Sequence, residues 1–425
     1  MYMEIRNSKT EMPLFKVKGE KFIFVGEKTI MKLSDMCIMF EDGDWIESKD
    51  QSDDGIRLLQ TGNIGEGKFL EKEGKERFIS RETFEKLKCK EVFSGDILIS
   101  RLPEPVGRAC LVPEKKQRMI TAVDCTICRI DDKKIRRRYL CYYLQSANYY
   151  TQLKNSITGT TRKRISRKNL GNIEIKIPSD KKQEEVIKQL DLIVEIIDNK
   201  KKKLQLLDTL VKSRFVELFG DPYVNPLKWK RLKIKDAVTI EPQNGLYKPQ
   251  SDYVADGTGT PILRIDGFYN GRVTDFGSLK RLKCSGMEQQ RYLLLEDDIV
   301  INRVNSIEYL GKCAHIKGLL EDTVYESNMM RMHFDPEHYN PVYICKLLCS
   351  QYIYDQIVNH AKKAVNQASI NQKDVLDFNI YQPPLELQNQ FTDFVVSVDK
   401  SKSKIQKSLE ETQLLFDSLM QRYFG

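Results

Sequence analysis

The chain of 425 residues contains two copies of one sequence plan, and this internal repeat constrains its fold more than any other feature. Residues 96–101 recur as residues 298–303, an offset of 202, and both segments are short apolar runs that end in arginine. The offset grows to 205 further along and then holds without a gap up to Gly220 and Gly425. Small loop insertions in a duplicated domain explain this drift.

The first part of each copy predicts a domain of mixed helices and strands. Short apolar runs separated by glycine-containing turns are typical of strands. One helix is expected in each copy, around residues 139–153 and 341–358. The predicted fold class is therefore α+β, with an internal repeat.

The second part of each copy predicts one long amphipathic helix. Its apolar residues alternate spacings of four and three, which is the heptad pattern of a coiled coil. Such a helix must bury its apolar stripe, and since the chain contains two, we expect them to pair with each other. An ordinary globular helix in each half is the alternative, which the length and the matched register disfavour. The predicted coiled-coil seam includes Leu190, Ile197, Leu204, Val211, Val395, Ile405, Leu409 and Phe416.

No sequence pattern indicates a catalytic centre. Residues 62–68 have the spacing of a phosphate-binding loop, but Phe69 stands where a magnesium-binding serine or threonine is required. Cys125 and Cys128 form a lone C-x-x-C, which favours small apolar side chains in a strand over a zinc knuckle. The four histidines have no metal-ligand spacing with one another or with an obvious acid. We therefore predict that the chain is not an enzyme and binds no metal and no cofactor.

Two polar loops at equivalent positions are the candidate DNA-binding segments. The net charge of +9 is compatible with a polyanionic partner. Lysine and arginine suit phosphates, whereas arginine and amide side chains suit base edges. Because the basic residues of the first loop are largely replaced by amides in the second, we expect one scaffold to read two different sequences; the alternative is a solvated loop without a ligand. The candidates are Thr160, Arg162, Lys163, Arg164, Arg167, Lys168, Lys362, Lys363, Asn366, Gln367, Ser369 and Asn371.

The cellular location is predicted to be the cytoplasm. The apolar runs are much shorter than a bilayer span, and the first residues lack a signal-peptide core. The ten cysteines are scattered singly, which fits a reducing compartment.

A set of short motifs in a fixed order carries a family resemblance. The most specific is Phe-Gly-Asp-Pro at residues 219–222, followed by Asn225-Pro226 and Trp229. Trp45 lies shortly before Ser48, and each long helix starts with a proline followed five residues later by glutamine. Together with the repeat, this order resembles the specificity subunit of type I restriction-modification enzymes, over nearly the whole chain.

The resemblance implies an organisation with two target-recognition domains, each reading one half of a bipartite site in double-stranded DNA. Two conserved helices that pack antiparallel would separate these domains and dock DNA methyltransferase subunits. The implied boundaries are an N-terminal extension at 1–27, domains at 28–180 and 221–382, and helices at 181–220 and 383–425. AdoMet would belong to the methyltransferase subunits, and ATP and Mg to motor-nuclease subunits.

Three other interpretations remain at this stage. A single-chain restriction or modification enzyme would require the catalytic motifs that are missing. A DNA-binding coiled-coil regulator would have no enzyme partner. A specificity subunit of a modification-only system would have the same sequence features.

Overall fold

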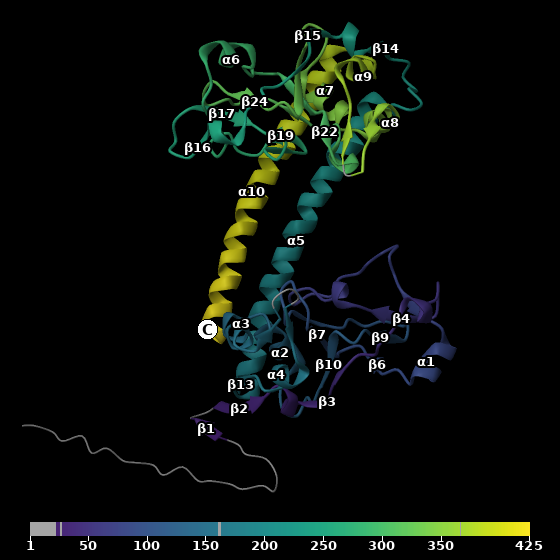
Figure 1. Ribbon diagram of the computed structural model, residues 1–425, viewed down its shortest axis with the longest axis vertical. Coiled ribbons are helices and arrows are strands. Elements are labelled where there is room, and N and C mark those ends of the chain that lie inside the picture. Colours follow the sequence, from purple (N-terminus) through teal and green to yellow (C-terminus); the bar gives the residue numbers. More distant parts are fainter. Residues whose placement is uncertain (1–22, 26–27, 160–162, 366) are drawn as a thin grey trace, which may run out of the picture. The chain divides into compact units, whose positions relative to one another are not determined.

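The computed structural model describes residues 23–25, 28–159, 163–365 and 367–425 (Figure 1). The chain divides into two compact units, which are described here separately. The first comprises residues 1–200 and 408–425, and the second comprises residues 201–407. Among the described residues, no helix is both long enough and apolar enough to cross a membrane.

The first unit is built on a four-stranded antiparallel sheet whose two faces are both buried. Its strand order is β3 (Cys37–Asp42), β10 (Cys125–Ile130), β7 (Ile97–Ser100) and β8 (Ala109–Leu111). Alternate side chains of a strand point to opposite faces. Accordingly, Ile97 and Cys128 join one apolar cluster, whereas Leu98 and Cys125 join another. The two thiols of the C-x-x-C therefore face different clusters, as small apolar side chains in a strand.

Helices cover one face of this sheet, and a smaller sheet adjoins it. The helices are α2 (Arg137–Tyr143), α3 (Ala147–Lys154) and α4 (Arg167–Gly171), whose apolar residues share a cluster with Ile97. The smaller sheet has the order β5 (Phe78–Ile79), β4 (Ile56–Leu59), β9 (Met119–Thr121) and β6 (Glu91–Val92), with α1 (Arg81–Leu87) following β5. A third sheet contains β1 (Ile23–Val25), β2 (Lys28–Lys32) and β13 (Glu174–Ile177).

The second unit repeats this topology, as the duplicated sequence predicts. Its main sheet has the order β15 (Val238–Asn244), β25 (Met329–Phe334), β21 (Ile299–Asn302), β23 (Cys313–His315), extended by β19 (Gly271–Val273) and β18 (Phe268–Tyr269). A smaller sheet contains β16 (Tyr253–Val254), β20 (Lys280–Leu282), β17 (Thr260–Leu263) and β24 (Val324–Tyr325), while β14 (Lys230–Lys233) pairs with β28 (Asn379–Gln382). The helices are α6 (Gly286–Arg291), α7 (Pro341–Leu348), α8 (Gln351–His360) and α9 (Gln372–Leu376).

The single helix expected before each polar loop is instead two helices. In the first unit α2 ends before Ser146, whose hydroxyl accepts a hydrogen bond from the backbone N–H of Tyr149 and starts α3. A serine in this position caps a new helix more favourably than it continues an old one. In the second unit, Ser350 lies at the equivalent break between α7 and α8.

Each unit contributes to two 40-residue helices, α5 (Asp180–Phe219) and α10 (Leu385–Phe424), at the places where the heptad pattern predicts them. In the first unit, Lys200 Nζ donates to Thr412 Oγ1 at 2.5 Å and Tyr423 donates to Gln189 at 2.5 Å. In the second unit, Lys402 pairs with Asp208 at 2.5 Å. Residue numbers rise along α5 as they fall along α10, so the two helices run antiparallel within each unit.

Burial along the predicted seam is uneven. Leu190, Ile197, Val211 and Val395 are buried, with 0%, 6%, 9% and 3% of their surface exposed. The remaining seam residues, Leu204, Ile405, Leu409 and Phe416, are partly exposed. Leu190, Val211 and Val395 lie where the helices pack against the sheet-containing parts of their units.

Two buried glutamines explain the spacing from proline to glutamine at the start of each long helix. Gln388 is 0% exposed and donates to Pro383 O at 2.8 Å and His338 O at 2.9 Å, while accepting from Asn340 N at 2.8 Å. In the first unit, Gln183 donates to the carbonyl of Pro178 and accepts from the N–H that precedes α2. Each glutamine thereby ties a long helix to the domain beside it.

The motif that follows α5 is a helix terminator. Gly220 has a φ of +78°, the left-handed conformation that glycine adopts at low cost after a helix. The indole N–H of Trp229 donates to Phe219 O at 2.9 Å, and Asn225 exchanges two hydrogen bonds with the backbone of Trp229. These contacts satisfy a carbonyl at the end of α5 and fix the chain that enters the second domain.

Candidate nucleic-acid interface

In the first unit, one end of the main sheet holds a buried arginine that organises the predicted DNA-binding loop. Arg101 follows β7 and is 5% exposed. Its Nε lies 3.2 Å from Asp42 Oδ1, and its Nη2 donates to Val123 O at 2.7 Å. Its carbonyl accepts from Ile165 N at 3.3 Å. Arg101 thus connects the end of β3, the loop before β10 and the start of the polar segment.

The electrostatics of this end are those of a cationic cluster. Burial lowers the pKa of Arg101, the Asp42 carboxylate opposes that shift, and the nearby Arg164 and Arg167 add to it. Arginine nevertheless stays protonated in proteins. Arg164 is itself half-exposed and pairs with Asp124 at 2.9 Å.

The predicted basic loop forms a short hairpin followed by α4. Strand β11 (Ile157–Thr158) pairs with β12 (Arg164–Ile165), and Ser166 caps α4 by accepting from Asn169 N at 3.1 Å. Lys163, Arg164, Arg167 and Lys168 are all exposed. Two of these cations lie in the first turn of α4, where positive charge opposes the helix dipole. Helix stability therefore does not account for their placement.

The second unit has the same arrangement with different side chains. Arg303 follows β21, donates to Ser327 O at 3.1 Å, and accepts at its carbonyl from Ile370 N at 3.0 Å. Strand β22 (Val304–Asn305) pairs with β27 (Ala368–Ser369), which pairs with β26 (Lys362–Lys363). The hairpin thus lies at the end of the main sheet in this unit as well.

The candidate residues of the second loop differ in how free their side chains are. Lys362, Lys363 and Gln367 are exposed, whereas Ser369 is partly buried. Asn371 is exposed, but its side-chain oxygen accepts from Asp374 N at 3.1 Å and caps α9. Three further candidates, Thr160, Arg162 and Asn366, lie outside the described residues.

The sequence interpretation missed a buried arginine and a partly buried lysine that hold neighbouring loops. Arg108 donates to Ile64 O at 2.7 Å, within the segment that superficially has phosphate-loop spacing, and to Thr61 O at 2.8 Å, just before that segment. Lys312, at the equivalent place in the repeat, donates to Ile265 O at 2.6 Å, and burial lowers its pKa. The repeated cation was the available signal, since both copies have a basic residue after the same glycine.

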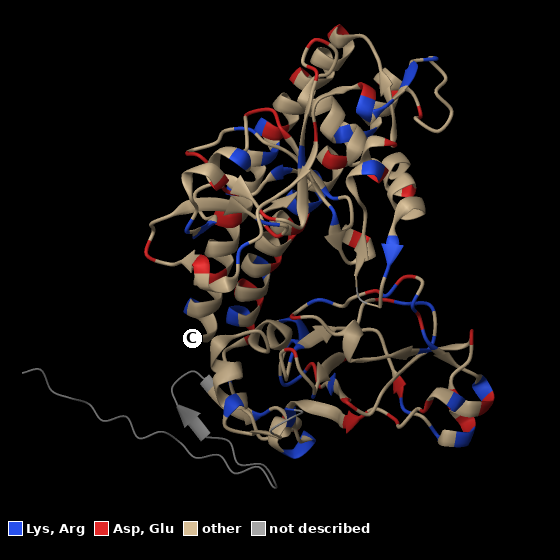
Figure 2. Ribbon diagram, turned by 45° about the horizontal axis from the view of Figure 1, so that its top comes forward, with Lys and Arg blue, Asp and Glu red and all other residues tan. Residues whose placement is uncertain are grey.

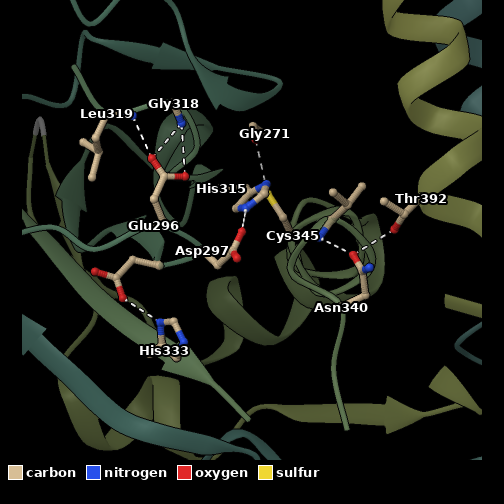
Figure 3. A network of polar contacts seen from close by, with 12 residues as sticks. Gly271, Glu296, Asp297, His315, Gly318, Leu319, His333, Asn340, Cys345 and Thr392 are labelled. Carbon is tan, nitrogen blue, oxygen red and sulfur yellow. Dashed lines mark hydrogen bonds and ion pairs between the residues drawn. The ribbon is translucent and has the colours of Figure 1, made fainter. Parts of the chain in front are cut away.

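The histidines of the second unit, which show no metal-ligand spacing with an obvious acid in the sequence, are paired with acids or a carbonyl in the folded chain. His315 lies 2.8 Å from Asp297, and His333 Nδ1 lies 3.0 Å from Asp298 Oδ1 (Figure 3). His360 Nδ1 lies 2.8 Å from a backbone carbonyl of its own helix. His338, Asp335 and Glu337 bring potential ligand atoms within 4.8 Å of one another on the surface. The spacing of these three residues in the sequence was overlooked.

Among the residues that Figure 2 colours, Lys and Arg positions alternate with Asp and Glu positions along the ribbon of each unit. A nucleic-acid contact would therefore depend on the local loops described above more than on a general positive field.

Comparison with known proteins decides the family. Two segments, residues 26–209 and 226–412, match the family model described as the type I restriction modification DNA specificity domain. The chain belongs to this family. Each matched segment contains one copy of the repeated main sheet, so this member has two specificity domains.

Two curated relatives are specificity subunits. That of type I restriction enzyme EcoKI from Escherichia coli strain K12 is 23% identical over 310 residues, covering 69% of this chain and 66% of that protein. The putative specificity subunit of MjaX from Methanocaldococcus jannaschii is 29% identical over 202 residues, covering 47% of this chain and 46% of that protein. The matches thus span less than two thirds of these relatives' own lengths.

Solved structures share the fold of the specificity domains. A chain of a type I R-M system, studied for its complex assembly and conformational transition, has a TM-score of 0.55 at 15% identity, over 96% of this chain and 99% of that one. The S subunit from M. genitalium has a TM-score of 0.51 at 14% identity, over 94% of this chain and 96% of that one. At such identities the likeness concerns the fold alone.

Proposed function

We propose that this specificity-family chain is the DNA-recognition subunit of a type I restriction-modification complex, with each domain reading one half of a bipartite site. One observation carries the proposal. In each unit an arginine at the same end of the main sheet anchors a hairpin and a short helix with exposed polar side chains. The first segment offers lysine and arginine, while the second offers lysine, glutamine and asparagine.

The difference between the two segments supports a bipartite site. Arginine can bond two acceptors of guanine, and glutamine or asparagine can bond adenine in the same bidentate way. Lysines of either segment suit phosphates, which position a protein without reading sequence. The two units thus present different base-reading side chains on the same hairpin and short helix, as the recognition of two unlike half-sites requires.

The long helices are proposed to form the antiparallel coiled coil that joins the two recognition domains and docks methyltransferase subunits. Support for docking comes from a groove of about 540 Å³ in the second unit, lined mainly by Leu206, Leu207, Leu210 and Ile405. Leu206 and Leu210 are 56% and 46% exposed and lie one helical turn apart. Such a stripe on a helix is typical of a protein-binding face.

Changing both exposed leucines, as Leu206→Asp with Leu210→Asp, should abolish copurification with the methyltransferase subunit without unfolding the chain. Leu320→Asp is the matched control, because Leu320 is 72% exposed outside the long helices. Equal copurification of the double variant and the control would refute docking at this groove.

Catalysis is proposed to come from the partners. The chain would bind no cofactor or metal, the methyltransferase subunits would bind AdoMet, and motor-nuclease subunits would use ATP and Mg. We expect the isolated chain neither to methylate nor to cut DNA, with methylation appearing when methyltransferase subunits and AdoMet are added. A modification-only complex would use the same chain without a nuclease subunit. Two matched specificity domains disfavour a coiled-coil regulator that lacks an enzyme partner.

Methylome sequencing of the host strain with and without this gene tests the proposal. We expect one bipartite methylated motif to disappear when the chain is removed and to return on complementation. An unchanged methylome in a strain that expresses the methyltransferase subunit would overturn the proposed function.

A further inference from the structure

Two exposed aromatic side chains occupy equivalent positions in the two units. Among the aromatic residues of the described parts of the chain, Trp45 and Tyr247 are the most exposed, at 71% and 77%. Single exposed apolar residues are common on proteins, so exposure alone assigns nothing. Their matched position in the repeat is the informative observation, since the offset between them equals that between Arg101 and Arg303.

The backbone before each aromatic residue is fixed in the same way. Asp44 leaves β3 and donates to Thr121 O at 2.9 Å, and Leu246 leaves β15 and donates to Tyr325 O at 2.8 Å. The glycine before each allows this approach, because a Cβ at residue 43 or 245 would lie 2.2 Å or 2.3 Å from a backbone oxygen. The residue between the glycine and the aromatic residue is Asp44 in one copy and Leu246 in the other, yet both copies have an aromatic ring at the next position.

Each aromatic lies at the same end of the sheet as the polar hairpin. In the first unit, Trp45 is three residues beyond Asp42, which pairs with Arg101, and the Arg101 carbonyl accepts from the hairpin.

In the second unit, Ser327 N donates to Leu246 O at 3.0 Å, immediately before Tyr247. The Ser327 carbonyl accepts from Arg303, whose own carbonyl accepts from Ile370 N of the hairpin segment. Three hydrogen bonds in series therefore join the residue before the aromatic side chain to the polar segment.

We propose that Trp45 and Tyr247 are DNA-contacting residues that each stack on a nucleobase in the half-site read by their own domain. The inference rests on the proposed function and adds a second mode of contact to it. Lysine, arginine and amide groups of the hairpins bind phosphates and base edges, whereas a flat neutral ring binds the face of a base. In a duplex each base face is covered by the neighbouring pair, so the ring would reach a base where a step opens, as it does when apolar side chains insert between base steps.

The test uses the full chain with its methyltransferase subunits and two duplexes, one with the methylated motif and one with that motif scrambled. Trp45→Ala or Tyr247→Ala should weaken binding to the motif duplex about tenfold to a hundredfold, the loss expected for one base–aromatic stack. Trp45→Phe and Tyr247→Phe should retain most of the affinity. Because the removed rings are neutral, the slope of log K against log salt should stay unchanged.

Two controls separate stacking from other effects. Tyr223→Ala removes an aromatic side chain that is 56% exposed in the segment after α5, and it should leave DNA affinity unchanged. The chain has two tryptophans, so in Trp45→Phe only Trp229 remains. Cognate DNA should quench tryptophan emission of the unmodified complex more than that of the Trp45→Phe complex, because the two differ only in Trp45.

The outcomes distinguish this inference from the proposed function. If the unmodified complex binds both duplexes equally, the proposed function fails. If it prefers the motif duplex while both alanine variants bind as tightly as the unmodified chain and Trp45→Phe does not reduce the quenching, the stacking inference is wrong and the proposed function stands.

Discussion

Replacing Gln388 by methionine should destabilise the second unit, because this buried glutamine ties the start of α10 to the domain. Methionine has a similar length and flexibility but makes none of the three hydrogen bonds of Gln388. These bonds engage Pro383, His338 and Asn340, at 2.8 to 2.9 Å. At a net contribution of about 0.5–1.5 kcal/mol each, their loss should lower the free energy of unfolding by about 2–4 kcal/mol.

Urea unfolding followed by tryptophan fluorescence measures this change in the correct unit. In the Trp45→Phe background the remaining Trp229 lies in the second unit, so its emission reports that unit's transition. Gln390→Met is the control on the same helix and in the same unit, since Gln390 is exposed and its replacement should change stability by about 0.5 kcal/mol or less. If Gln388→Met unfolds at the same urea concentration as this control, the glutamine does not anchor the helix.

Three further changes test other parts of the account. Lys168→Ala should weaken binding to all DNA sequences and reduce the salt slope by about one unit, as measured by titration at several salt concentrations; an effect on one sequence only would contradict a phosphate contact. Leu190→Ala should cost about 2–5 kcal/mol in urea unfolding and Leu204→Ala less, because the first side chain is 0% exposed and the second only partly buried; equal losses would contradict the uneven seam. Contact with Lys248 and hydrogen bonds at the start of α6 lower the pKa of Glu288 from 4.5 to about 2, so its stabilising contribution is complete above pH 4.5 and is lost as the pH falls toward 2. Glu288→Gln should therefore make the urea midpoint less dependent on pH between about 4.5 and 2. An unchanged pH dependence would show that the Glu288 carboxylate does not cause it.

The repeat and the long helices could be predicted because their signals are local and periodic. Heptad spacing persists over about ten turns of each helix. Such a pattern can be recognised in the local sequence, without knowledge of the rest of the fold. The break at Ser146 could not be read in the same way, because apolar residues continue on both sides of it. A hydroxyl that bonds the N–H of Tyr149 decides the outcome, and that bond depends on the packed structure.

The candidate interface was located in the sequence but its architecture was not. Strands β11 and β12 are two residues each, too short for an alternating pattern to appear. The anchoring role of Arg101 depends on Asp42 and Val123, which are distant in the chain. Likewise Trp45 was visible as part of a motif, whereas its exposure and its place at the same end of the sheet as the hairpin require the folded chain. The predicted contacts of individual loop residues with DNA stay predictions.

The central claim is that each domain reads its own half of the DNA site, and a domain exchange tests it most directly. Residues 28–180 should be replaced by the corresponding domain of another family member with a different motif, and the methylome of the resulting strain sequenced. We predict that one half of the methylated motif changes to that of the donor while the other half stays the same. A motif in which both halves change together would contradict independent reading by the two domains.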